Sequence, residues 1–440
     1  MLHFGTDGVR AAAYSQLTPD AVAGLGRAAA SVLGSGEWVI GRDTRESGEV
    51  FEQALAAGLV AAGATVSLAG VVPTPALAFI GAANDVATAV ITASHNPYHD
   101  NGVKLFAPGG RKLADDIERR IETAWVRSGD DIASADVPMH VIDLVDPYVA
   151  RLLSLFPEAC LSSLDVVLDC ANGAMSVVAP RVARMLGANV RVIHSTPNGR
   201  NINHECGATH PADLSATVVR FKADLGLAFD GDGDRVIAVD HTGRVVDGDR
   251  LIALAALQLR ESGELTNDTV VVTVMSNLGF HRAMGAAGVN VRTTAVGDRY
   301  VLEELEAGDY AIGGEQSGHI IYRHLATTGD GLLAGLRLAQ YVHDHRATLA
   351  ELASGVMRSY PQVLVNVRVA QRHPDVAAEL AAEIAVAESA LGGDGRVLVR
   401  ASGTEPLIRV MVEAATVEDA EAVTAQLVQV VTDRFGRELG

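Results

Sequence analysis

The residues best suited to carry chemistry form a loop of alternating carboxylates and glycines at residues 230–234. Asp230, Asp232 and Asp234 are separated by single glycines, and apolar segments typical of strands lie on both sides. Carboxylates that converge repel one another. A hard divalent cation with oxygen ligands removes that repulsion, and glycines let the backbone turn tightly around it. Because three protein carboxylates leave a coordination position for a phosphate oxygen, the loop predicts one Mg²⁺ per chain that serves phosphoryl transfer.

Two other interpretations compete with a catalytic metal site. An EF-hand needs glycine at its sixth position and glutamate at its twelfth, where this chain has Arg235 and His241, so an EF-hand is excluded. A solvated acidic turn stays open as the plain alternative. Arg235 directly follows the loop and is a candidate to hold a phosphoryl group, since guanidinium groups bind phosphate oxygens.

A serine follows an apolar strand in the segment T-A-S-H-N-P at residues 92–97. Ligands of open α/β sheets gather at this end of a strand, and Pro97 keeps the preceding Asn96 out of helical conformation. Ser94 is therefore a candidate nucleophile or phosphate carrier on a stiff loop. An ordinary strand-end turn is the plain alternative. A hydrolase elbow is disfavoured, because the G-x-S-x-G pattern is absent.

Two further side chains near the serine are candidates for catalysis. His95 adjoins Ser94, but neighbouring side chains of an extended chain point apart, so we expect His95 to be a poor general base for it. Lys104 lies shortly downstream, in the segment N-G-V-K. It could offer a cation to a phosphate or help to move a proton.

A polar, glycine-rich segment at residues 313–319 reads G-G-E-Q-S-G-H. Glu315 and Ser317 have side chains suited to hydrogen bonds with adjacent sugar hydroxyls. A polar turn without a ligand is the alternative for this segment.

The segment R-A-S-G-T-E-P at residues 400–406, with Arg409 beyond it, combines the groups that bind a phosphate. Arginine supplies a bidentate fork, serine and threonine supply hydroxyls, and glycine lets backbone N–H groups approach the anion. The G-x-x-x-x-G-K-[ST] pattern of nucleotide triphosphatases is absent, so a nucleotide triphosphate site is disfavoured.

The elements that must position these loops repeat three times along the chain. Each copy has a short apolar strand, an alanine-rich helix, a glycine and a second strand, which is the pattern of a βαβ unit. The first strands of the three copies are expected at residues 37–41, 165–169 and 270–272. The C-terminal part differs, with strands expected at residues 363–369, 396–399 and 408–413 and helices at residues 377–390 and from residue 417 onward.

This pattern predicts three consecutive α/β domains with mixed sheets, followed by a smaller α+β domain. We place the domains at residues 1–158, 159–257, 258–368 and 369–440. No long linker separates them, so we expect them to pack directly around a central cleft. The serine, aspartate, sugar and phosphate loops then fall one in each domain.

The composition limits the partners of the chain. It has 440 residues and a formal net charge of −19, which argues against nucleic acid and anionic membranes as partners but leaves an anionic small molecule open. Three cysteines without a C-x-x-C pair fit a reducing cytoplasm better than a disulfide framework.

Charged residues interrupt the apolar character of the N-terminus, so no signal peptide is expected. Residues 53–84 carry no charge, but prolines and glycines break this stretch into helix, turn and strand rather than a membrane span.

Taken together, the four loops resemble those of the α-D-phosphohexomutase superfamily over essentially the whole chain. Its T-A-S-H-N-P, D-G-D-G-D-R, G-E-x-S-G-H and R-x-S-G-T-E-P segments all occur here in this order. Within the superfamily, the segments F-G-T-D-G-V-R at residues 4–10 and V-G-D-R-Y at residues 296–300, together with Gln316, look most like the phosphoglucosamine mutase branch. Ala401 stands where that branch often has proline.

The resemblance implies a role for each loop. Ser94 would carry a phosphoryl group and share the metal with Asp230, Asp232 and Asp234, with Arg10, His95 and Lys104 as further catalytic candidates. The implied substrate-binding residues are Arg235, Gly297, Asp298, Glu315, Ser317, Gly318, Arg400, Ser402, Gly403, Thr404 and Arg409.

The implied reaction interconverts glucosamine 6-phosphate and glucosamine 1-phosphate, with glucosamine 1,6-bisphosphate as intermediate and activator. The nearest alternative is the same chemistry on mannose or glucose phosphates. A metal-dependent phosphatase with a serine nucleophile and a non-catalytic sugar-phosphate sensor are more distant ones. The oligomeric state is left open, with a homodimer as one option.

Overall fold

The computed structural model describes residues 2–5, 7–127, 140–402 and 406–436. The chain forms two compact units, which are described separately. The first comprises residues 1–275 and 289–356, and the second comprises residues 276–288 and 357–440. Among the helices formed by the described residues, none combines the length and the hydrophobicity that a membrane span requires. The domain boundaries set at residues 158, 257 and 368 stay predictions.

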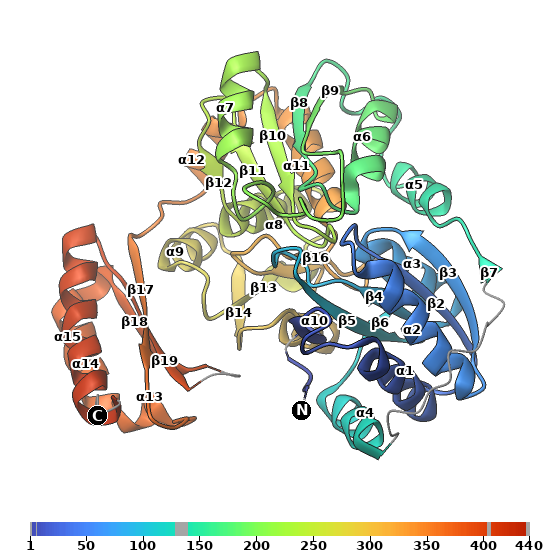
Figure 1. Cartoon of the computed structure of the whole chain (residues 1–440). Coiled ribbons are helices and arrows are strands. Elements are labelled where there is room, and N and C mark those ends of the chain that lie inside the picture. Colours follow the sequence, from blue (N-terminus) through green and yellow to red (C-terminus); the bar gives the residue numbers. More distant parts are fainter. Residues whose placement is uncertain (1, 6, 128–139, 403–405, 437–440) are drawn as a thin grey trace. The chain divides into compact units, whose positions relative to one another are not determined.

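The first unit begins with a mixed sheet, coloured blue in Figure 1. The order of its strands is β1 (Val9–Ala12), β5 (Asp100–Ala107), β4 (Ala87–Ile91), β2 (Glu37–Arg42), β3 (Thr65–Val71) and β7 (His140–Val141), with β6 (Arg111–Lys112) on β5. Strand β2 pairs in parallel with β3 and β4, whereas β4 pairs with β5 and β5 with β1 in antiparallel fashion. The helices of this part are α1 (Pro19–Leu33), α2 (Gly48–Ala61), α3 (Thr74–Asn84), α4 (Asp115–Arg127) and α5 (Val145–Leu153).

Helices α1 and α2 pack very closely, and glycine makes this possible. A Cβ atom at Gly58 would lie 1.9 Å from the carbonyl oxygen of Ala23, and one at Gly26 would lie 2.5 Å from that of Leu55. Thr18 starts α1, because its hydroxyl accepts a hydrogen bond from the Ala21 amide at 3.2 Å. Glycines therefore set the close contact between the two helices, while Trp38 and Phe51 supply the large buried rings of the same core.

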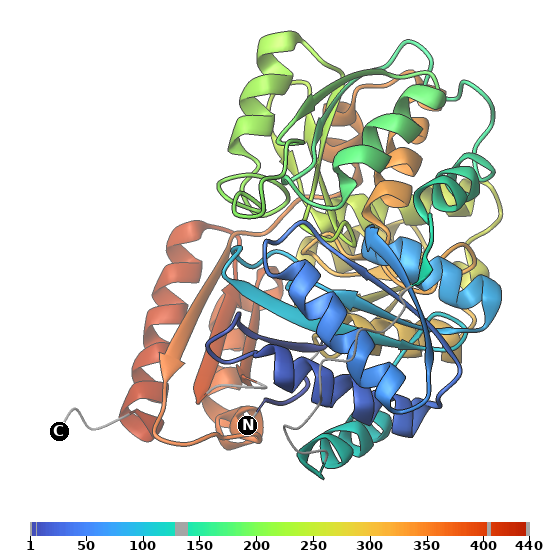
Figure 2. The ribbon, with the colours of Figure 1, turned by 45° about the vertical axis from the view of Figure 1, so that its right-hand side comes forward.

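Two further sheets complete the first unit. One has the order β12 (Val245–Val246), β11 (Val236–Asp240), β10 (Leu225–Phe229), β8 (Asp165–Asp169) and β9 (Asn189–Ile193), with helices α6 (Met175–Met185) and α7 (Ala212–Phe221). The other has the order β14 (Asn290–Thr294), β13 (Thr269–Thr273), β15 (Ile312–Gly314) and β16 (Ile320–Tyr322), with α8 (Gly248–Glu261), α10 (Asp298–Ala307), α11 (Gly331–His345) and α12 (Leu349–Val356). In Figure 2, α6 and α7 are the green helices that pack against the strands of the former sheet.

The second unit holds an antiparallel sheet of the order β17 (Gln362–Arg368), β19 (Leu407–Glu413) and β18 (Arg396–Ala401). Its helices are α9 (Leu278–Ala286), α13 (Val376–Glu379), α14 (Ala381–Leu391) and α15 (Val417–Phe435). The single helix expected at residues 377–390 is wrong, because the backbone leaves helical geometry at Leu380, with φ −109° and ψ 15°, and divides it in two.

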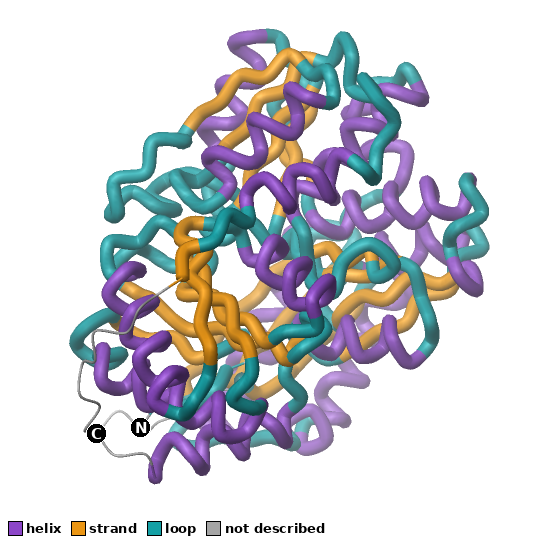
Figure 3. The backbone as a smooth tube through the Cα atoms, turned by 90° about the vertical axis from the view of Figure 1, so that its right-hand side faces the viewer, coloured by secondary structure: helices purple, strands orange, loops and turns teal. Residues whose placement is uncertain are grey.

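The predicted fold class is confirmed. Three mixed or partly parallel sheets with helices precede a smaller α+β part, and Figure 3 shows strands in orange with helices in purple throughout. The strands expected from residues 37, 165 and 270 are β2, β8 and β13. The uncharged stretch at residues 53–84 spans the end of α2, the strand β3 and the whole of α3.

Candidate active site

Ser94 lies just beyond β4 and its side chain is buried. The Thr92 hydroxyl accepts a hydrogen bond from the Ser94 amide at 2.9 Å, and the Ser94 hydroxyl donates one to Oδ2 of Asp230 at 2.6 Å. The backbone at Ser94 is left-handed, with φ 51°. The expectation that Ser94 and His95 point apart is therefore wrong, because it assumed extended backbone. Ser94 Oγ and His95 Nδ1 are 3.3 Å apart.

A buried arginine that the sequence reasoning missed fixes the serine loop. The Arg45 guanidinium donates to Asp43 Oδ2 at 2.9 Å, and this ion pair is fully buried. The same guanidinium donates to the backbone carbonyls of Ser94, Asn96, Pro97 and Asp100. Asn203 adds a hydrogen bond to the Ser94 carbonyl at 2.8 Å. The serine loop is thus held through its backbone carbonyl groups. Because every residue type has a carbonyl group, these contacts leave no recognisable motif in the sequence of the loop.

The aspartate loop joins β10 to β11, and it brings the three predicted metal ligands together. Carboxylate oxygens of Asp230, Asp232 and Asp234 lie within 4.8 Å of one another, and all three side chains are buried. Burial and its two acidic neighbours raise the pKa of Asp230 well above its usual value. One oxygen each of Asp232 and Asp234 has no hydrogen-bond partner among the described residues. These oxygen donors fit Mg²⁺, which prefers carboxylate and phosphate ligands.

Lys104 supplies part of the charge that opposes these carboxylates. Its ammonium group lies 2.8 Å from Asp232, 2.9 Å from Asp234 and 2.8 Å from Asp7. Burial alone would lower the pKa of Lys104, but the three carboxylates outweigh it and raise the pKa. Lys104 is therefore a fixed cation, which favours the charge-binding role over proton transfer. Asp7, which the sequence reasoning left out, holds this ammonium group from the N-terminal segment.

Two more predicted site residues, Arg10 and Asp298, lie near Asp7. Arg10 forms an ion pair with Asp7, and Lys112 forms ion pairs with both Asp7 and Asp298. Burial would raise the pKa of Asp7, but the ammonium groups of Lys104 and Lys112 hold it well below the usual range. Arg10 and Asp298 thus belong to the same charge network as the aspartate loop.

His319 connects the aspartate loop with the sugar loop. Its Nδ1 lies 3.6 Å from Asp234 and its Nε2 lies 3.4 Å from Asp298. Arg235, directly after the aspartate loop, forms an isolated β-bridge with His319, and its Nε is 3.8 Å from Asp234. The segment 313–319 is therefore held beside the aspartate loop by both its backbone and the imidazole of His319.

Glu315 and Ser317 lie in the turn between β15 and β16. The carboxylate of Glu315 accepts a hydrogen bond from the Gly297 amide at 3.1 Å and another from the Ser317 hydroxyl at 3.4 Å. Gly318 has φ 90°, and a Cβ atom there would lie 2.2 Å from the Val236 carbonyl oxygen. Glycine is therefore required where the sugar loop meets β11.

The phosphate loop follows β18 in the second unit. Arg400 and Arg409 lie directly opposite each other on β18 and β19. Burial, followed by the charge of Arg409, lowers the pKa of Arg400. Ser402 is buried, and Nε of Arg409 is a buried donor without a hydrogen-bond partner among the described residues. Two arginines at paired positions on neighbouring strands suit a phosphate. Gly403 and Thr404 lie outside the described residues.

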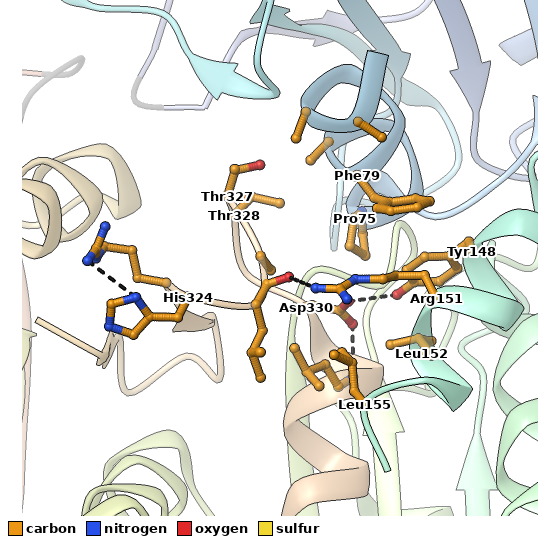
Figure 4. Close-up of a pocket in the computed structure, with 17 residues that line it drawn as sticks. Pro75, Phe79, Tyr148, Arg151, Leu152, Leu155, His324, Thr327, Thr328 and Asp330 are labelled. Carbon is orange, nitrogen blue, oxygen red and sulfur yellow. Dashed lines mark hydrogen bonds between the residues drawn. The ribbon is translucent and has the colours of Figure 1, made fainter. Parts of the chain in front are cut away.

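A cavity of about 350 Å³ in the first unit contains none of the predicted site residues. It lies among α3, α5 and the segment before α11, and Figure 4 shows Pro75, Phe79 and Leu155 around it. In the wall of this cavity, the Tyr148 hydroxyl donates a hydrogen bond to Asp330 at 2.8 Å.

Helix α3, which lines the cavity, also contacts the aspartate loop. Thr74, at the start of α3, donates a hydrogen bond to Asp232 at 2.6 Å.

Comparisons with known proteins agree with this arrangement. Family models for the alpha/beta/alpha domains I, II and III of phosphoglucomutase/phosphomannomutase match residues 1–129, 146–243 and 247–360. The model for the C-terminal domain of the same family matches residues 364–430. A buried serine beside a triad of carboxylates, on this series of α/β domains, defines a phosphosugar mutase of the α-D-phosphohexomutase superfamily, an isomerase.

Similar proteins narrow the family. A phosphoglucosamine mutase from Mycolicibacterium paratuberculosis is 49% identical over 440 residues, with 98% of each chain covered. A putative phosphomannomutase from Thermus thermophilus has a TM-score of 0.82 at 25% identity, covering 98% of this chain and 99% of the other. The N-acetylphosphoglucosamine mutase of Aspergillus fumigatus, solved with GlcNAc-6P and magnesium, shares the fold with a TM-score of 0.71 at 20% identity, covering 98% of this chain and 95% of the other. The chain belongs to the phosphoglucosamine mutase family.

Proposed function

We propose that this enzyme interconverts glucosamine 6-phosphate and glucosamine 1-phosphate, with Ser94 as the carrier of the phosphoryl group. The observation that carries this proposal is the hydrogen bond of 2.6 Å between the Ser94 hydroxyl and Asp230. It puts the serine oxygen at the edge of a buried triad of carboxylates, where a phosphoryl group would meet the metal ligands. The relatives at about half identity carry the phosphoglucosamine mutase name, which supports the choice of sugar.

Asp230, Asp232, Asp234 and an oxygen on Ser94 would hold Mg²⁺. When bound, the ion would neutralise negative charge on the transferring phosphoryl group. The residues of the chain provide the rest of the electrostatic setting. Lys104 is a buried cation and Arg235 a partly buried one beside the carboxylates, and their donors would bind phosphoryl oxygens.

In the first half of the reaction, the bond from phosphorus to Ser94 Oγ breaks and a bond to the free sugar hydroxyl forms. This yields glucosamine 1,6-bisphosphate and leaves the hydroxyl of Ser94. In the second half, the other phosphate of the bisphosphate returns a phosphoryl group to Ser94, and the product leaves. Because the carrier must be loaded before the first turnover, we expect the bisphosphate to act as an activator as well.

The remaining loops would bind the part of the substrate that does not react. Glu315 and Ser317 would accept and donate hydrogen bonds to sugar hydroxyls, with Gly318, Gly297 and Asp298 shaping that side of the site. The phosphate that is not being transferred would bind to Arg400, Ser402, Gly403, Thr404 and Arg409. This second phosphate site favours a mutase over a phosphatase, since a hydrolase has less need to hold a second phosphate.

Two measurements test the proposal. Phosphopeptide mapping of the protein incubated with glucosamine 1,6-bisphosphate and Mg²⁺ should find the phosphate on Ser94. Ser94→Ala should lower turnover by at least about 10³-fold, because the carrier is lost. The exposed Ser162, changed to alanine, is the matched control and should keep full turnover. Normal turnover of Ser94→Ala would contradict the mechanism.

The choice of sugar is tested separately. Side-by-side kcat/KM values for the glucosamine, glucose and mannose phosphates should be largest for glucosamine, since specificity is a ratio of these values. A larger value for mannose or glucose phosphate would make the enzyme a phosphomannomutase/phosphoglucomutase. Release of inorganic phosphate at the rate of turnover would identify a phosphatase instead.

A further inference from the structure

A second group of metal-ligating side chains lies in the first unit, apart from the aspartate loop. Asp169 is the last residue of β8, His194 directly follows the neighbouring strand β9, and Cys206 lies in the loop before α7. Ligand atoms of these three residues lie within 4.8 Å of one another. Asp169 and Cys206 are fully buried, while His194 reaches the surface with 25% of its side chain exposed.

The two ring nitrogens of His194 face two different carboxylates. Nδ1 lies 3.1 Å from Asp169 Oδ2, and Nε2 lies 3.4 Å from Asp213 Oδ2. Nδ1 is buried, and apart from this close approach to Asp169 it has no hydrogen-bond partner among the described residues. A neutral imidazole carries only one proton. If that proton points to Asp213, the bare Nδ1 and the Asp169 carboxylate face each other as two electron donors.

A cation between Nδ1 and the Asp169 carboxylate resolves this conflict. Metal-bound histidines usually donate their other N–H to a carboxylate, which is the position that Asp213 occupies relative to His194. Nitrogen and oxygen ligands at roughly 2.0–2.2 Å from a tetrahedral zinc ion lie about 3.3 Å apart. The separation of 3.1 Å between the two atoms here is close to that value.

Cys206 distinguishes a metal site from a simple ion pair. An imidazolium between Asp169 and Asp213 would need no thiol. Yet the Cys206 sulfur lies within this group, and it accepts a long hydrogen bond of 3.9 Å from the side-chain amide of Asn172. A set of one sulfur, one nitrogen and one oxygen ligand suits zinc-class cations, whereas Mg²⁺ prefers oxygen alone.

The group is connected to the serine loop through a short path. Asn203, three residues before Cys206, donates hydrogen bonds to the carbonyls of Ser94 at 2.8 Å and Asn96 at 3.1 Å. The backbone N–H of Asn203 donates to the carbonyl of Ala171 at 2.9 Å, and Ala171 lies two residues after Asp169. A cation that ties Asp169 to Cys206 would therefore also restrain the segment that supports Ser94.

We propose that Asp169, His194 and Cys206 form a second metal site, which takes a zinc-class cation with a solvent ligand on the side of His194. Its role is to join the ends of β8 and β9 to the segment 203–207 and so to steady the support of the serine loop. The buried thiol must lose its proton when the cation binds, so binding releases a proton to solvent.

The metal alone is the probe for this site. The full-length protein, freed of metals, is titrated with Co²⁺, which absorbs strongly when a thiolate binds it, and then with Zn²⁺ to displace it. We expect one thiolate-bound Co²⁺ per chain. The absorption should vanish in Cys206→Ser and persist in Cys160→Ser, a matched control at another buried cysteine. It should also persist in Asp232→Asn, which alters only the aspartate loop.

Two further variants separate a metal site from a folding effect. Asp213→Asn should weaken Zn²⁺ binding about 10–100-fold while the protein stays folded, because this carboxylate only orients the imidazole. Zn²⁺ should also raise the thermal midpoint of the wild-type protein and not that of His194→Gln. Absence of a thiolate-bound Co²⁺ signal in the wild-type protein would overturn the proposal. So would a signal that survives in Cys206→Ser, or Zn²⁺ affinity that is unchanged in Asp213→Asn.

Discussion

The aspartate loop and the Arg400–Arg409 pair are opposite in charge but alike in design. The first collects three buried carboxylates, and the second places two arginines directly opposite each other on neighbouring strands. Like charges so close together destabilise the protein that holds them. A ligand of the opposite charge would therefore stabilise each region, a cation in one case and an anion in the other.

The two regions differ in how the chain limits this cost. Several distant segments supply counter-charge and hydrogen bonds to the aspartate loop, among them Lys104 and Thr74. The arginine pair rests on the strands of a single small sheet. We infer that the aspartate loop is rigid before a ligand arrives, because more segments of the chain hold it in place.

The largest effect that tests this comparison is expected at Asp230. Asp230→Asn removes a metal ligand and should lower phosphoryl transfer by at least about 10³-fold. Because burial and its acidic neighbours raise the pKa of Asp230, the neutral amide should also stabilise the metal-free protein, by about 1 kcal/mol. Turnover and the thermal midpoint in chelator measure the two effects. Glu303→Gln, an exposed change on α10, is the control and should alter neither.

The next effect concerns the scaffold of the serine loop. Arg45→Met leaves Asp43 as an unpaired buried carboxylate and removes donors from four carbonyls, so it should lower the free energy of unfolding by about 3–5 kcal/mol. Arg200→Met breaks an exposed ion pair with Glu46 and should leave the free energy of unfolding nearly unchanged, because solvent screens such pairs. Urea unfolding compares the two. Equal losses would show that the Arg45 contacts do not carry the loop.

A smaller effect is expected at the arginine pair. Arg400→Gln should raise KM about 10–100-fold, with less change in kcat, because the lost guanidinium would bind the phosphate that does not react. Relief of the repulsion with Arg409 should leave the thermal midpoint unchanged or slightly higher. Arg368→Gln, an exposed change on β17, serves as the control. A fall in kcat at constant KM would instead place Arg400 in the chemical step.

The smallest effect concerns a buried carboxylate with neutral partners. Asp330 accepts hydrogen bonds from Tyr148 and from the Leu333 amide, and burial raises the pKa of Asp330 to about 6. Its folded pKa exceeds the unfolded one, so its contribution to stability is full below about pH 4 and is lost as the pH rises through 6. Thermal midpoints from pH 4 to 8 should show this loss in the wild-type protein. Asp330→Asn should lack it, and parallel curves would refute the assignment.

The sequence predicted the parts of the site that depend on local pattern. Apolar runs located β4, β10 and β11, and the alternating aspartates could converge only as a triad. The supports of the site were missed. Arg45 reaches the serine loop from the segment after β2, and Asp7 reaches Lys104 from the N-terminal segment. Such contacts depend on how strands are ordered in the sheet, which residue types do not reveal.

The misjudged relation between Ser94 and His95 has a different cause. The argument assumed extended backbone after a strand, and a single residue with φ 51° reversed it. The residue type does not reveal this conformation, because serine has no strong preference for it. The Ser94 carbonyl is held by hydrogen bonds from Arg45 and Asn203, which are distant in the sequence. Local sequence could name the reacting residue but could not orient it.

Lys104 also has a consequence for how the protein folds before a metal ion binds. A pocket of three aspartates without an internal cation would make completion of the fold wait for a metal ion. The ammonium group of Lys104, bound to Asp232 and Asp234, would let the chain reach its folded shape before any metal ion binds. Synthesis and metal loading can then proceed as separate events, and a cell short of magnesium would accumulate an idle enzyme rather than a misfolded one.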